Sequence, residues 1–410
     1  MKHIIILGDG MADHPIERLG GKTPLQYAAT PYMDMLASLG RTGRLITIPE
    51  GFMPGSEVAN TAILGYDLNM VYEGRGPLEA ASIGYDMRPD DLALRCNIVT
   101  LDNNVIKNHH GGHLTTTEAD VMIKYLDGQL GNDNIRFITG TQYRHLLIIR
   151  RGNKHILCAP PHDHPDEPWR PLMVKPEPGY EDDKTNGRMT PQETADLLNG
   201  LILKSQELLN NNYMKSFHHR DGSLSIWPWG GGYRPDMLPL SQIYPQIKSG
   251  SVISAVDLIR GIGRYAGLKN IPVEGATGLA DTNYEGKAMA ALDALHTDDF
   301  VFLHIEASDE AGHDGDLSLK LKTIENLDSR IIGPIYREVS QWHESVAIAV
   351  LPDHPTPVEV RTHVDEPVPF LIWHKDISPD DVSSFNEVSC VSGSYGLLKL
   401  SQFMKEFMKI

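Results

Sequence analysis

Apolar positions along the chain form two patterns, short continuous runs and spaced repeats, and these alternate at both ends of the sequence. The continuous runs predict buried strands, whereas apolar positions three and four apart predict helices that pack on them. Strands are predicted at 3–7, 43–48, 271–273, 300–305 and 345–351. Helices are predicted at 30–39, 57–64, 252–265, 285–295 and 317–339. Strand and helix in alternation predict an α/β fold with a mostly parallel central sheet.

The middle of the chain has a different pattern, with scattered strands and proline-rich connections. Strands are predicted at 94–101 and 145–149, an amphipathic helix at 191–209 after a Thr-Pro-Gln-Glu cap, and a turn-rich loop at 227–235. The simplest organisation is a core in two segments, 1–72 and 247–410, interrupted by an inserted α+β domain at 73–246. The two joins are then the expected hinges.

Composition and charge limit the classes of molecule that the protein is expected to bind. The formal net charge is −17, which argues against nucleic acid or an anionic membrane but is compatible with a local basic pocket for a small phosphorylated anion. Cys96, Cys158 and Cys390 show no C-x-x-C spacing, which indicates packed thiols in a reducing compartment. The apolar runs are too short for a signal peptide or a membrane span, so we expect a cytoplasmic protein.

Carboxylates and histidines cluster in the last quarter of the chain, directly after predicted strands. The cluster comprises Asp309, His313, Asp353, His354 and His363. Any one of them alone is more commonly a surface or core residue. The carboxyl ends of parallel strands meet at one edge of a sheet, however, and desolvated carboxylates there need a positive partner. The pattern therefore predicts a metal pocket built from oxygen and nitrogen ligands.

Two residues near the N-terminus join this hypothesis. Asp9 follows the first strand and by itself resembles a turn former, but beside the C-terminal cluster it becomes a candidate ligand. Ser56 precedes a predicted helix and is either an N-cap or a nucleophile. A nearby metal ion would lower the pKa of its hydroxyl, and such an alkoxide suits phosphoryl transfer.

Basic residues beside chain breakers are candidates for phosphate binding, although each has a structural alternative. They are Lys287, Arg75, Arg144 and Arg234, which are otherwise a solvated lysine and ion-paired arginines. His109, His110 and His113 form a third metal site, a proton-transfer group or a polar loop. We favour substrate contact, because no carboxylate or cysteine joins them at ligand spacing. His162 and Asp163 belong to a rigid turn or line the cleft.

Several motifs together resemble one family. They are Asp9-Gly10, Pro54-Gly-Ser56, Asp281-Thr-Asn-Tyr-Glu-Gly-Lys287, Asp309-Glu-Ala-Gly-His313, Asp353-His354 and His363. This set resembles the cofactor-independent (2,3-bisphosphoglycerate-independent) phosphoglycerate mutases of the archaeal type, within the alkaline phosphatase superfamily. The resemblance covers essentially the whole chain. It implies a phosphatase-like core, an inserted transferase domain and two divalent ions, usually manganese, with zinc, magnesium or cobalt as alternatives.

The resemblance also implies roles. One ion would be bound by Asp309, His313 and His363, and the other by Asp9, Ser56, Asp353 and His354. Ser56 would take the phosphoryl group from 3-phosphoglycerate and return it to the 2-hydroxyl, while Lys287 would stabilise the transferred group. A small phosphorylated molecule is then the substrate. Nothing in the sequence bears on the oligomeric state.

One departure from the family pattern concerns the substrate. Where archaeal-type mutases carry an Arg-Arg-Ala-Gly-Arg run, this chain has His109-His-Gly-Gly-His113. That change resembles a branch proposed to act as homoserine kinase, which would make O-phosphohomoserine with the same serine and metals. Phosphoglycerate mutation is the leading function, homoserine phosphorylation the alternative, and a plain phosphatase or a non-catalytic metal site follow.

Overall fold

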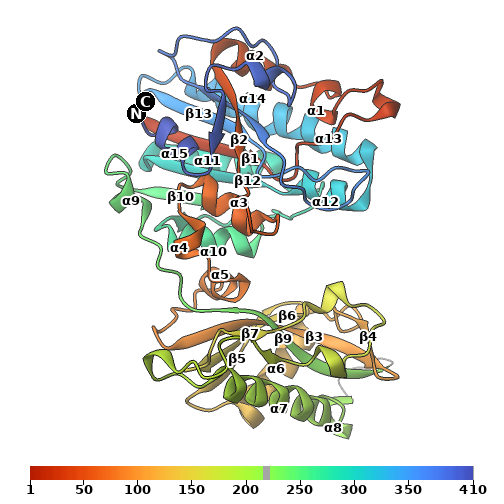
Figure 1. Cartoon of the computed structure of the whole chain (residues 1–410). Coiled ribbons are helices and arrows are strands. Elements are labelled where there is room, and N and C mark those ends of the chain that lie inside the picture. Colours follow the sequence, from red (N-terminus) through yellow and green to blue (C-terminus); the bar gives the residue numbers. More distant parts are fainter. Residues whose placement is uncertain (216–221, 410) are drawn as a thin grey trace. The chain divides into compact units, whose positions relative to one another are not determined.

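The computed structural model describes residues 1–215 and 222–409, and the chain divides into two compact units. The core unit comprises Met1–Tyr72 and Asp236–Ile410, and the insert unit comprises Glu73–Pro235. Figure 1 shows the core unit formed by both ends of the chain, coloured red and blue, and the insert unit formed by its middle.

The boundary after Pro235 precedes the one that we expected after residue 246. The intervening residues belong to the core unit because they bond to it. The Leu240 N–H donates to the Ala266 carbonyl over 2.8 Å, and the Tyr66 hydroxyl donates to the Leu238 carbonyl over 2.6 Å. Leu240 begins the short helix α9 (Leu240–Ile243) and is buried.

The core unit is built on an eight-stranded sheet in the order β11-β10-β12-β1-β13-β14-β2-β15. The strands are β1 (Lys2–Gly8), β2 (Arg41–Ile46), β10 (Gly250–Ile253), β11 (Lys269–Asn270), β12 (Phe300–Ile305), β13 (Val346–Leu351), β14 (Val368–Trp373) and β15 (Leu397–Lys399). Within this sheet, only β14 of the described strands runs antiparallel to both of its neighbours. The predicted α/β fold with a mostly parallel central sheet is confirmed.

The three central strands bring their carboxyl ends to one edge of the sheet. β1, β12 and β13 are buried along their whole length, as expected of strands covered on both faces. Gly8 lies beside Ile305, and Leu7 lies beside Leu351. The polar residues that follow these strands are therefore neighbours, although hundreds of positions separate them in sequence.

Helices accompany this sheet through the sequence. They are α1 (Pro24–Tyr27), α2 (Pro31–Leu39), α3 (Ser56–Ile63), α4 (Leu68–Val71), α10 (Asp257–Tyr265), α11 (Tyr284–Thr297), α12 (Ala307–Asp314), α13 (Leu317–Leu327), α14 (Gly333–Val339) and α15 (Gln402–Phe407). The helix expected at 252–265 is wrong at its start, where the apolar residues form β10. The helix expected at 317–339 is interrupted by a π-helical turn, Asp328–Ile332.

The insert unit contains a five-stranded antiparallel sheet, with order β4-β3-β6-β5 and β9 paired to β3. Its strands are β3 (Asp91–Asp102), β4 (Val105–Asn108), β5 (Ile135–Thr141), β6 (Arg144–Arg150) and β9 (Ser223–Gly232). Its helices are α5 (Arg75–Ser82), α6 (Thr116–Leu130), α7 (Pro191–Leu209) and α8 (Asn212–Lys215), and β7 (Ile156–Leu157) pairs with β8 (Lys175–Pro176). Figure 1 shows α6 and α7 on one face of the sheet, where they share an apolar core with it.

The stretch from Trp227, which we predicted as a loop, continues strand β9 as far as Gly232. Pro228 stands opposite Cys96 of β3, and β9 has no second neighbour among the described residues. Proline lacks an N–H and is tolerated on such an edge strand. Trp227 and Trp229 are buried and reinforce the pairing through packing. Because proline and glycine are typical of turns, the sequence pattern did not indicate that this segment is an edge strand.

Two features bear on the environment of the protein. Cys96, Cys158 and Cys390 are all unpaired. Among the described residues, no helix combines the length and apolar character that crossing a membrane requires.

Acidification should destabilise the insert unit through His145 of β6. Its side chain is buried, its Nδ1 accepts the Gly140 N–H, and burial lowers its pKa to about 3. Since an unfolded histidine titrates near pH 6.5, the folded state binds fewer protons. The stabilising contribution is complete above pH 6.5 and declines as pH falls toward 3, by up to about 1.4 kcal/mol per unit. Urea unfolding at pH 7 and pH 5 measures this loss.

The variant His145→Gln retains an acceptor but does not titrate, so we expect a smaller pH dependence of its unfolding free energy. The exposed His343→Gln is the matched control. An unchanged pH dependence in His145→Gln contradicts the assignment.

Candidate active site

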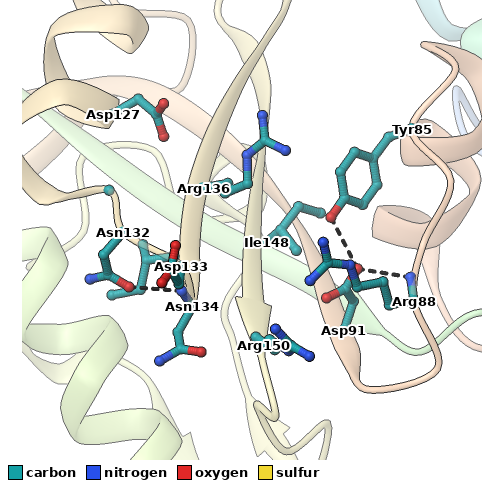
Figure 2. Close-up of a pocket in the computed structure, with 12 residues that line it drawn as sticks. Tyr85, Arg88, Asp91, Asp127, Asn132, Asp133, Asn134, Arg136, Ile148 and Arg150 are labelled. Atoms are coloured by element: carbon teal, nitrogen blue, oxygen red, sulfur yellow. Dashed lines mark hydrogen bonds between the residues drawn. The ribbon is translucent and has the colours of Figure 1, made fainter.

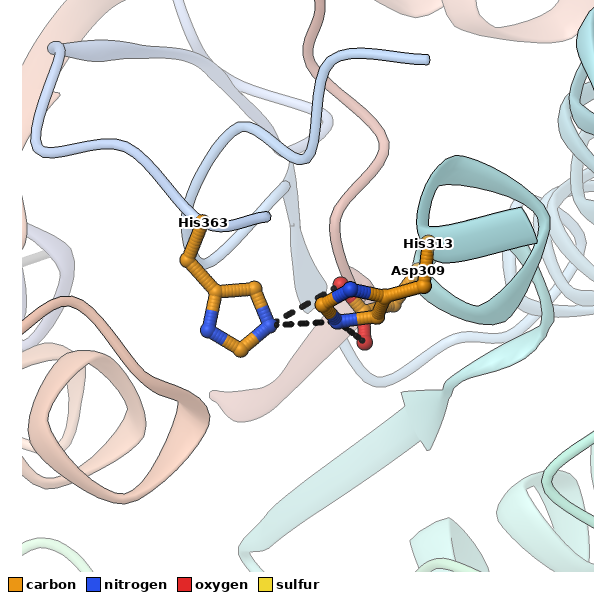
Figure 3. A group of neighbouring side chains, drawn as sticks. All are labelled: Asp309, His313 and His363. Atoms are coloured by element: carbon orange, nitrogen blue, oxygen red, sulfur yellow. Dashed lines mark hydrogen bonds and ion pairs between the residues drawn. The ribbon is translucent and has the colours of Figure 1, made fainter. Parts of the chain in front are cut away.

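The first group of candidate ligands lies beyond β12. Asp309 and His313 stand four residues apart on α12 and face the same side, and His363 approaches them from the loop after β13 (Figure 3). The Nε2 atoms of the two histidines are 2.9 Å apart. Asp309 lies 3.3 Å from His313 Nε2 and 3.4 Å from His363 Nε2. Two nitrogens and a carboxylate therefore point at one position.

The tautomers of these histidines fit a cation at that position. His313 Nδ1 lies 3.1 Å from the Arg361 carbonyl and His363 Nδ1 lies 3.3 Å from the Pro54 carbonyl. Carbonyl oxygens only accept, so both Nδ1 atoms carry protons, and in its neutral form each ring offers the Nε2 lone pair to a cation. The hydrogen bond that the protonated His313 ring donates to the Asp309 carboxylate raises the pKa of His313 to about 9. A proton thus occupies the place that a metal ion suits.

The second group gathers around Asp9 at the end of β1. The Ser56 hydroxyl lies 3.3 Å from Asp9 Oδ2 and 3.2 Å from His354 Nε2. His354 Nε2 is in turn 3.4 Å from Asp353 Oδ2. The four predicted residues of this group are therefore linked by one connected set of contacts. Ligand atoms of Asp9, Asp309 and His354 also lie within 4.8 Å of one another, so the two groups adjoin.

Ser56 is not the N-cap of its helix. The cap position of α3 is Gly55, and Ser56 is the first helical residue. Its hydroxyl faces the carboxylate of Asp9 instead of the helix backbone. The alternative in which Ser56 merely caps the helix is wrong, and its oxygen stands at a helix N-terminus that favours negative charge.

His304 belongs to the second group, and sequence reasoning missed it. It lies in β12, is fully buried, and places Nε2 2.9 Å from Asp9 Oδ2. Burial lowers its pKa to about 4, so it is neutral at physiological pH. The signal in the sequence was a single polar residue near the end of an otherwise apolar strand.

Three buried carboxylates dominate the electrostatics of the site. Asp9, Asp309 and Asp353 are at most 5% exposed. Burial raises the pKa of Asp9 well above its usual value, and the carboxylates of Asp353 and Asp309 raise it further. Burial alone would also raise the pKa of Asp309, but hydrogen bonds from His313 and His363 hold it well below its ordinary range. Such crowding is stable when cations neutralise it, so these residues fit divalent metal ions.

Lys287 lies near this group and is not the solvated lysine of our alternative. Its side chain on α11 is only 1% exposed, and its Nζ donates to the Thr277 carbonyl over 3.5 Å. Burial lowers its pKa to about 8, against the opposing effect of Glu306. Its charge also contributes to lowering the pKa of His304. A weakly solvated ammonium of this kind is available to pair with an anion.

Six of the substrate-binding candidates gather in the insert unit around two aromatic rings. His109 lies 5.6 Å from Tyr143 and 6.1 Å from His162 between ring centroids, and His110 stacks on His113 at 4.0 Å. The Arg144 guanidinium lies over Tyr143, and that of Arg75 lies over Trp229, 5.9 Å from the ring centroid. His162 is 5.1 Å from the same tryptophan. We call these six residues the basic cluster.

Arg95 adds a further cation to the basic cluster and was not predicted. Its guanidinium lies 5.0 Å from the centroid of Trp229 and donates to Asn97 over 3.1 Å and Glu79 over 3.0 Å. Arg95 and Asn97 are two residues apart on β3, so they share a face of the sheet. A polar pair with that spacing inside a predicted strand was the available signal.

Two candidates have other neighbours. Asp163 pairs with His162 at 3.5 Å, on the rim of the basic cluster. Arg234 lies 3.8 Å from Asp86 and 3.5 Å from the Met87 carbonyl, and no contact with the basic cluster is recorded for it among the described residues. The structure therefore assembles the histidines and two of the arginines, and leaves Arg234 apart.

The insert unit also contains a separate cavity of about 520 Å³ (Figure 2). Its charged lining consists of Arg88, Arg136, Arg150, Asp91, Asp127 and Asp133. Guanidinium and carboxylate groups balance each other, and Asp91 already accepts from the Tyr85 hydroxyl and the Arg88 N–H. The lining includes no residue of the basic cluster. We assign this cavity no function.

Comparison with known proteins gives consistent relatives. The family model described as 2,3-bisphosphoglycerate-independent phosphoglycerate mutase matches residues 37–214. A protein of that name from Methanosarcina acetivorans is 45% identical, with both chains covered in full. A protein from Geobacter sulfurreducens, named a probable enzyme of this kind, is 43% identical over 96% of each chain.

Solved structures agree with these relatives. A protein from Pyrococcus horikoshii superimposes with a TM-score of 0.81 at 29% identity, covering all of this chain and 97% of its own. The cofactor-independent phosphoglycerate mutase from Thermoplasma acidophilum gives a TM-score of 0.68 at 25% identity, covering all of this chain and 99% of its own.

Metal binding should stabilise the folded protein through these carboxylates. We expect Mn²⁺ added to metal-stripped protein to raise its melting temperature. At a Mn²⁺ concentration about a hundred times the dissociation constant, the free energy of unfolding should rise by about 2.7 kcal/mol. The isosteric variant Asp309→Asn should lose most of this gain, because it removes a charged ligand. Differential scanning calorimetry with and without Mn²⁺ measures both.

Asp314→Asn is the matched control, since Asp314 is exposed on the same helix, α12. Equal stabilisation of Asp309→Asn and the wild-type protein contradicts the metal site.

Proposed function

The chain belongs to the 2,3-bisphosphoglycerate-independent phosphoglycerate mutase family, and on this premise we propose that it interconverts 3-phosphoglycerate and 2-phosphoglycerate. It is then an isomerase of glycolysis and gluconeogenesis that acts by phosphoryl transfer. The observation that carries the proposal is the Ser56 hydroxyl, held between the Asp9 carboxylate and His354 within two adjoining groups of metal ligands.

Ser56 is the proposed nucleophile. Its oxygen attacks the phosphorus of 3-phosphoglycerate, the bond from phosphorus to the C3 oxygen breaks, and that oxygen takes up a proton. The C2 hydroxyl then attacks the phosphorus of the phosphoserine and gives up its proton, the bond from phosphorus to the Ser56 oxygen breaks, and that oxygen takes up a proton. Asp9 and His354 are the nearest proton acceptors to the serine hydroxyl. Bound divalent ions would lower the pKa of the Ser56 hydroxyl and neutralise the charge that develops in both steps.

Lys287 is the proposed partner of the phosphoryl oxygens. Its burial on α11 leaves the ammonium poorly solvated, as the lowered pKa of about 8 reflects. Transferring phosphoryl groups carry charge on three oxygens, and a fixed cation stabilises that charge more effectively in a dry site than in water.

We propose two manganese ions as the metals. The first would be held by Asp309, His313 and His363, and the second by Asp9, Ser56, Asp353 and His354. Mixed carboxylate and imidazole donors suit Mn²⁺, while Zn²⁺, Mg²⁺ and Co²⁺ are the alternatives that metal replacement distinguishes. His304 contacts Asp9 and orients it, or serves as a further ligand of the second ion.

The basic cluster is the proposed binding site for the anionic groups of the phosphoglycerate. Arginines offer bidentate hydrogen bonds to carboxylate and phosphate. Burial lowers the pKa of His109, with His162 and Arg95 adding to the effect, so this ring acts as a neutral hydrogen-bonding group. His109 would then contribute a directed hydrogen bond in place of a full charge.

The alternative function, phosphorylation of homoserine, has less support, because the relatives that match over the full chain carry the mutase name. We also propose that the enzyme works in the cytoplasm. Its three unpaired cysteines agree with a reducing compartment.

Removing the nucleophile should abolish the reaction. We expect Ser56→Ala to lose at least about 10³-fold in kcat for conversion of 3-phosphoglycerate to 2-phosphoglycerate with Mn²⁺, since Ser56 is the group proposed to carry the phosphoryl intermediate. An enolase-coupled assay measures the rate, and mass spectrometry of acid-quenched wild-type enzyme detects phosphoserine at position 56.

Ser38→Ala, an exposed serine of α2, is the control. Wild-type enzyme that leaves phosphoglycerate unchanged but forms O-phosphohomoserine would refute the mutase proposal in favour of the alternative.

Substrate affinity tests the basic cluster. We expect Arg75→Gln to raise KM for 3-phosphoglycerate about tenfold with a smaller change in kcat, because a charge-assisted contact made in both ground and transition states is lost. Arg234→Gln, in the same unit but outside the cluster, should leave both constants close to those of the wild type. An equal rise of KM in both variants contradicts the assignment.

A further inference from the structure

Lys320 of α13 is buried beneath the loops that carry the proposed metal ligands. Its side chain is fully buried and its ammonium has three acceptors. Nζ lies 2.8 Å from Asp13 Oδ2, 2.7 Å from the Thr356 carbonyl and 3.2 Å from the Ala12 carbonyl. All three donor positions of the ammonium are therefore used, and they reach two segments far apart in sequence.

The Asp13 carboxylate completes the link between those two segments. Its Oδ1 accepts the His14 N–H over 2.7 Å, and its Oδ2 accepts the Val358 N–H over 3.1 Å. The pair thus joins the loop after β1, which begins with Asp9, to the loop after β13, which contains Asp353 and His354. A helix packed beneath both loops supplies the cation.

Thr356 connects this pair to the ligands themselves. Its hydroxyl contacts Asp309 Oδ1 and lies 3.3 Å from His354 Nδ1. One ligand from each proposed metal group is therefore oriented by the residue whose carbonyl Lys320 holds. Thr356 also packs tightly on α12, because a Cβ at Gly312 would come within 2.3 Å of the Thr356 carbonyl.

A buried ion pair is an expensive way to fill this space. Removing both charges from water costs several kcal/mol per ion, and apolar residues of similar volume are often as stable or more so. Stability alone therefore does not explain the pair. What an apolar substitute lacks is the set of directed bonds to Ala12 and Thr356.

We propose that Lys320, paired with Asp13, is a positioning residue that fixes Thr356 and the two ligand loops in the geometry that binds metal. The inference rests on the proposed metal sites. Groups that orient ligands typically contribute 10- to 100-fold in metal affinity, and Lys320 acts through such a group.

Metal affinity separates positioning from stability. The titration uses Mn²⁺ and the full-length, metal-stripped protein, with free Mn²⁺ counted by electron paramagnetic resonance and the stability of the metal-free protein measured by urea unfolding. We expect Lys320→Met to bind Mn²⁺ about tenfold or more weakly and to lose stability, because Asp13 is left buried and unpaired. Lys322→Met, exposed on the same helix, should match the wild type.

The double variant Lys320→Met/Asp13→Asn removes both charges. Positioning predicts that stability returns toward the wild-type value while Mn²⁺ affinity stays low, because the bonds to Ala12 and Thr356 are still missing. If affinity returns with stability, Lys320 only neutralises Asp13 and the inference is overturned.

Thr356→Val tests the same link without changing a buried charge, and should also weaken Mn²⁺ binding about tenfold. Wild-type affinity in this variant or in Lys320→Met overturns the inference while leaving the proposed function intact. Failure of the wild-type protein to bind Mn²⁺ overturns the metal centre of the proposed function itself.

Discussion

The burial of three carboxylates at one edge of a parallel sheet is the constraint on which the rest of this structure depends. Asp9, Asp309 and Asp353 are almost inaccessible to water, and their charges repel one another where the dielectric is low. Such a site persists only if cations or protons neutralise it. The same constraint would make the site reactive, because the hydroxyl of Ser56 lies close to the position of any metal ion that these carboxylates bind.

The sheet meets this constraint through strand order. β12, β1 and β13 are adjacent and parallel, so the loops after them begin side by side at one edge of the sheet. The helix after β12 adds His313 one turn beyond Asp309, and α3 adds Ser56 from another direction. Lys320 links the loop after β1 to the loop after β13 through hydrogen bonds to Ala12, Asp13 and Thr356. Strands, helices and the loops bonded to them thus hold atoms within about 3 Å of each other.

Predictability differed between the parts of the site. Asp309, Asp353 and His354 were visible because a polar group directly after an apolar run is a local pattern. His304, Arg95 and Lys320 were not used, because each sits inside a strand or helix whose apolar neighbours make a polar residue look incidental. The loop predicted from Trp227 onward was wrong for the opposite reason. Proline and glycine in that segment suggested a loop, but an edge strand tolerates both. Local sequence patterns were therefore sufficient to identify the proposed metal ligands, but not the residues that support them.

By itself, the sequence determined the α/β class and the existence of an insert, and it pointed to the residues that we propose as metal ligands, because hydrophobic periodicity and strand-end polarity are properties of neighbouring residues. The motifs also carried the family resemblance. Tertiary structure alone decided which ligand meets which, that Ser56 faces Asp9 instead of capping its helix, and that Lys320 reaches two loops at once. These are distances between residues up to about 300 positions apart, and only the packing of the sheet sets them.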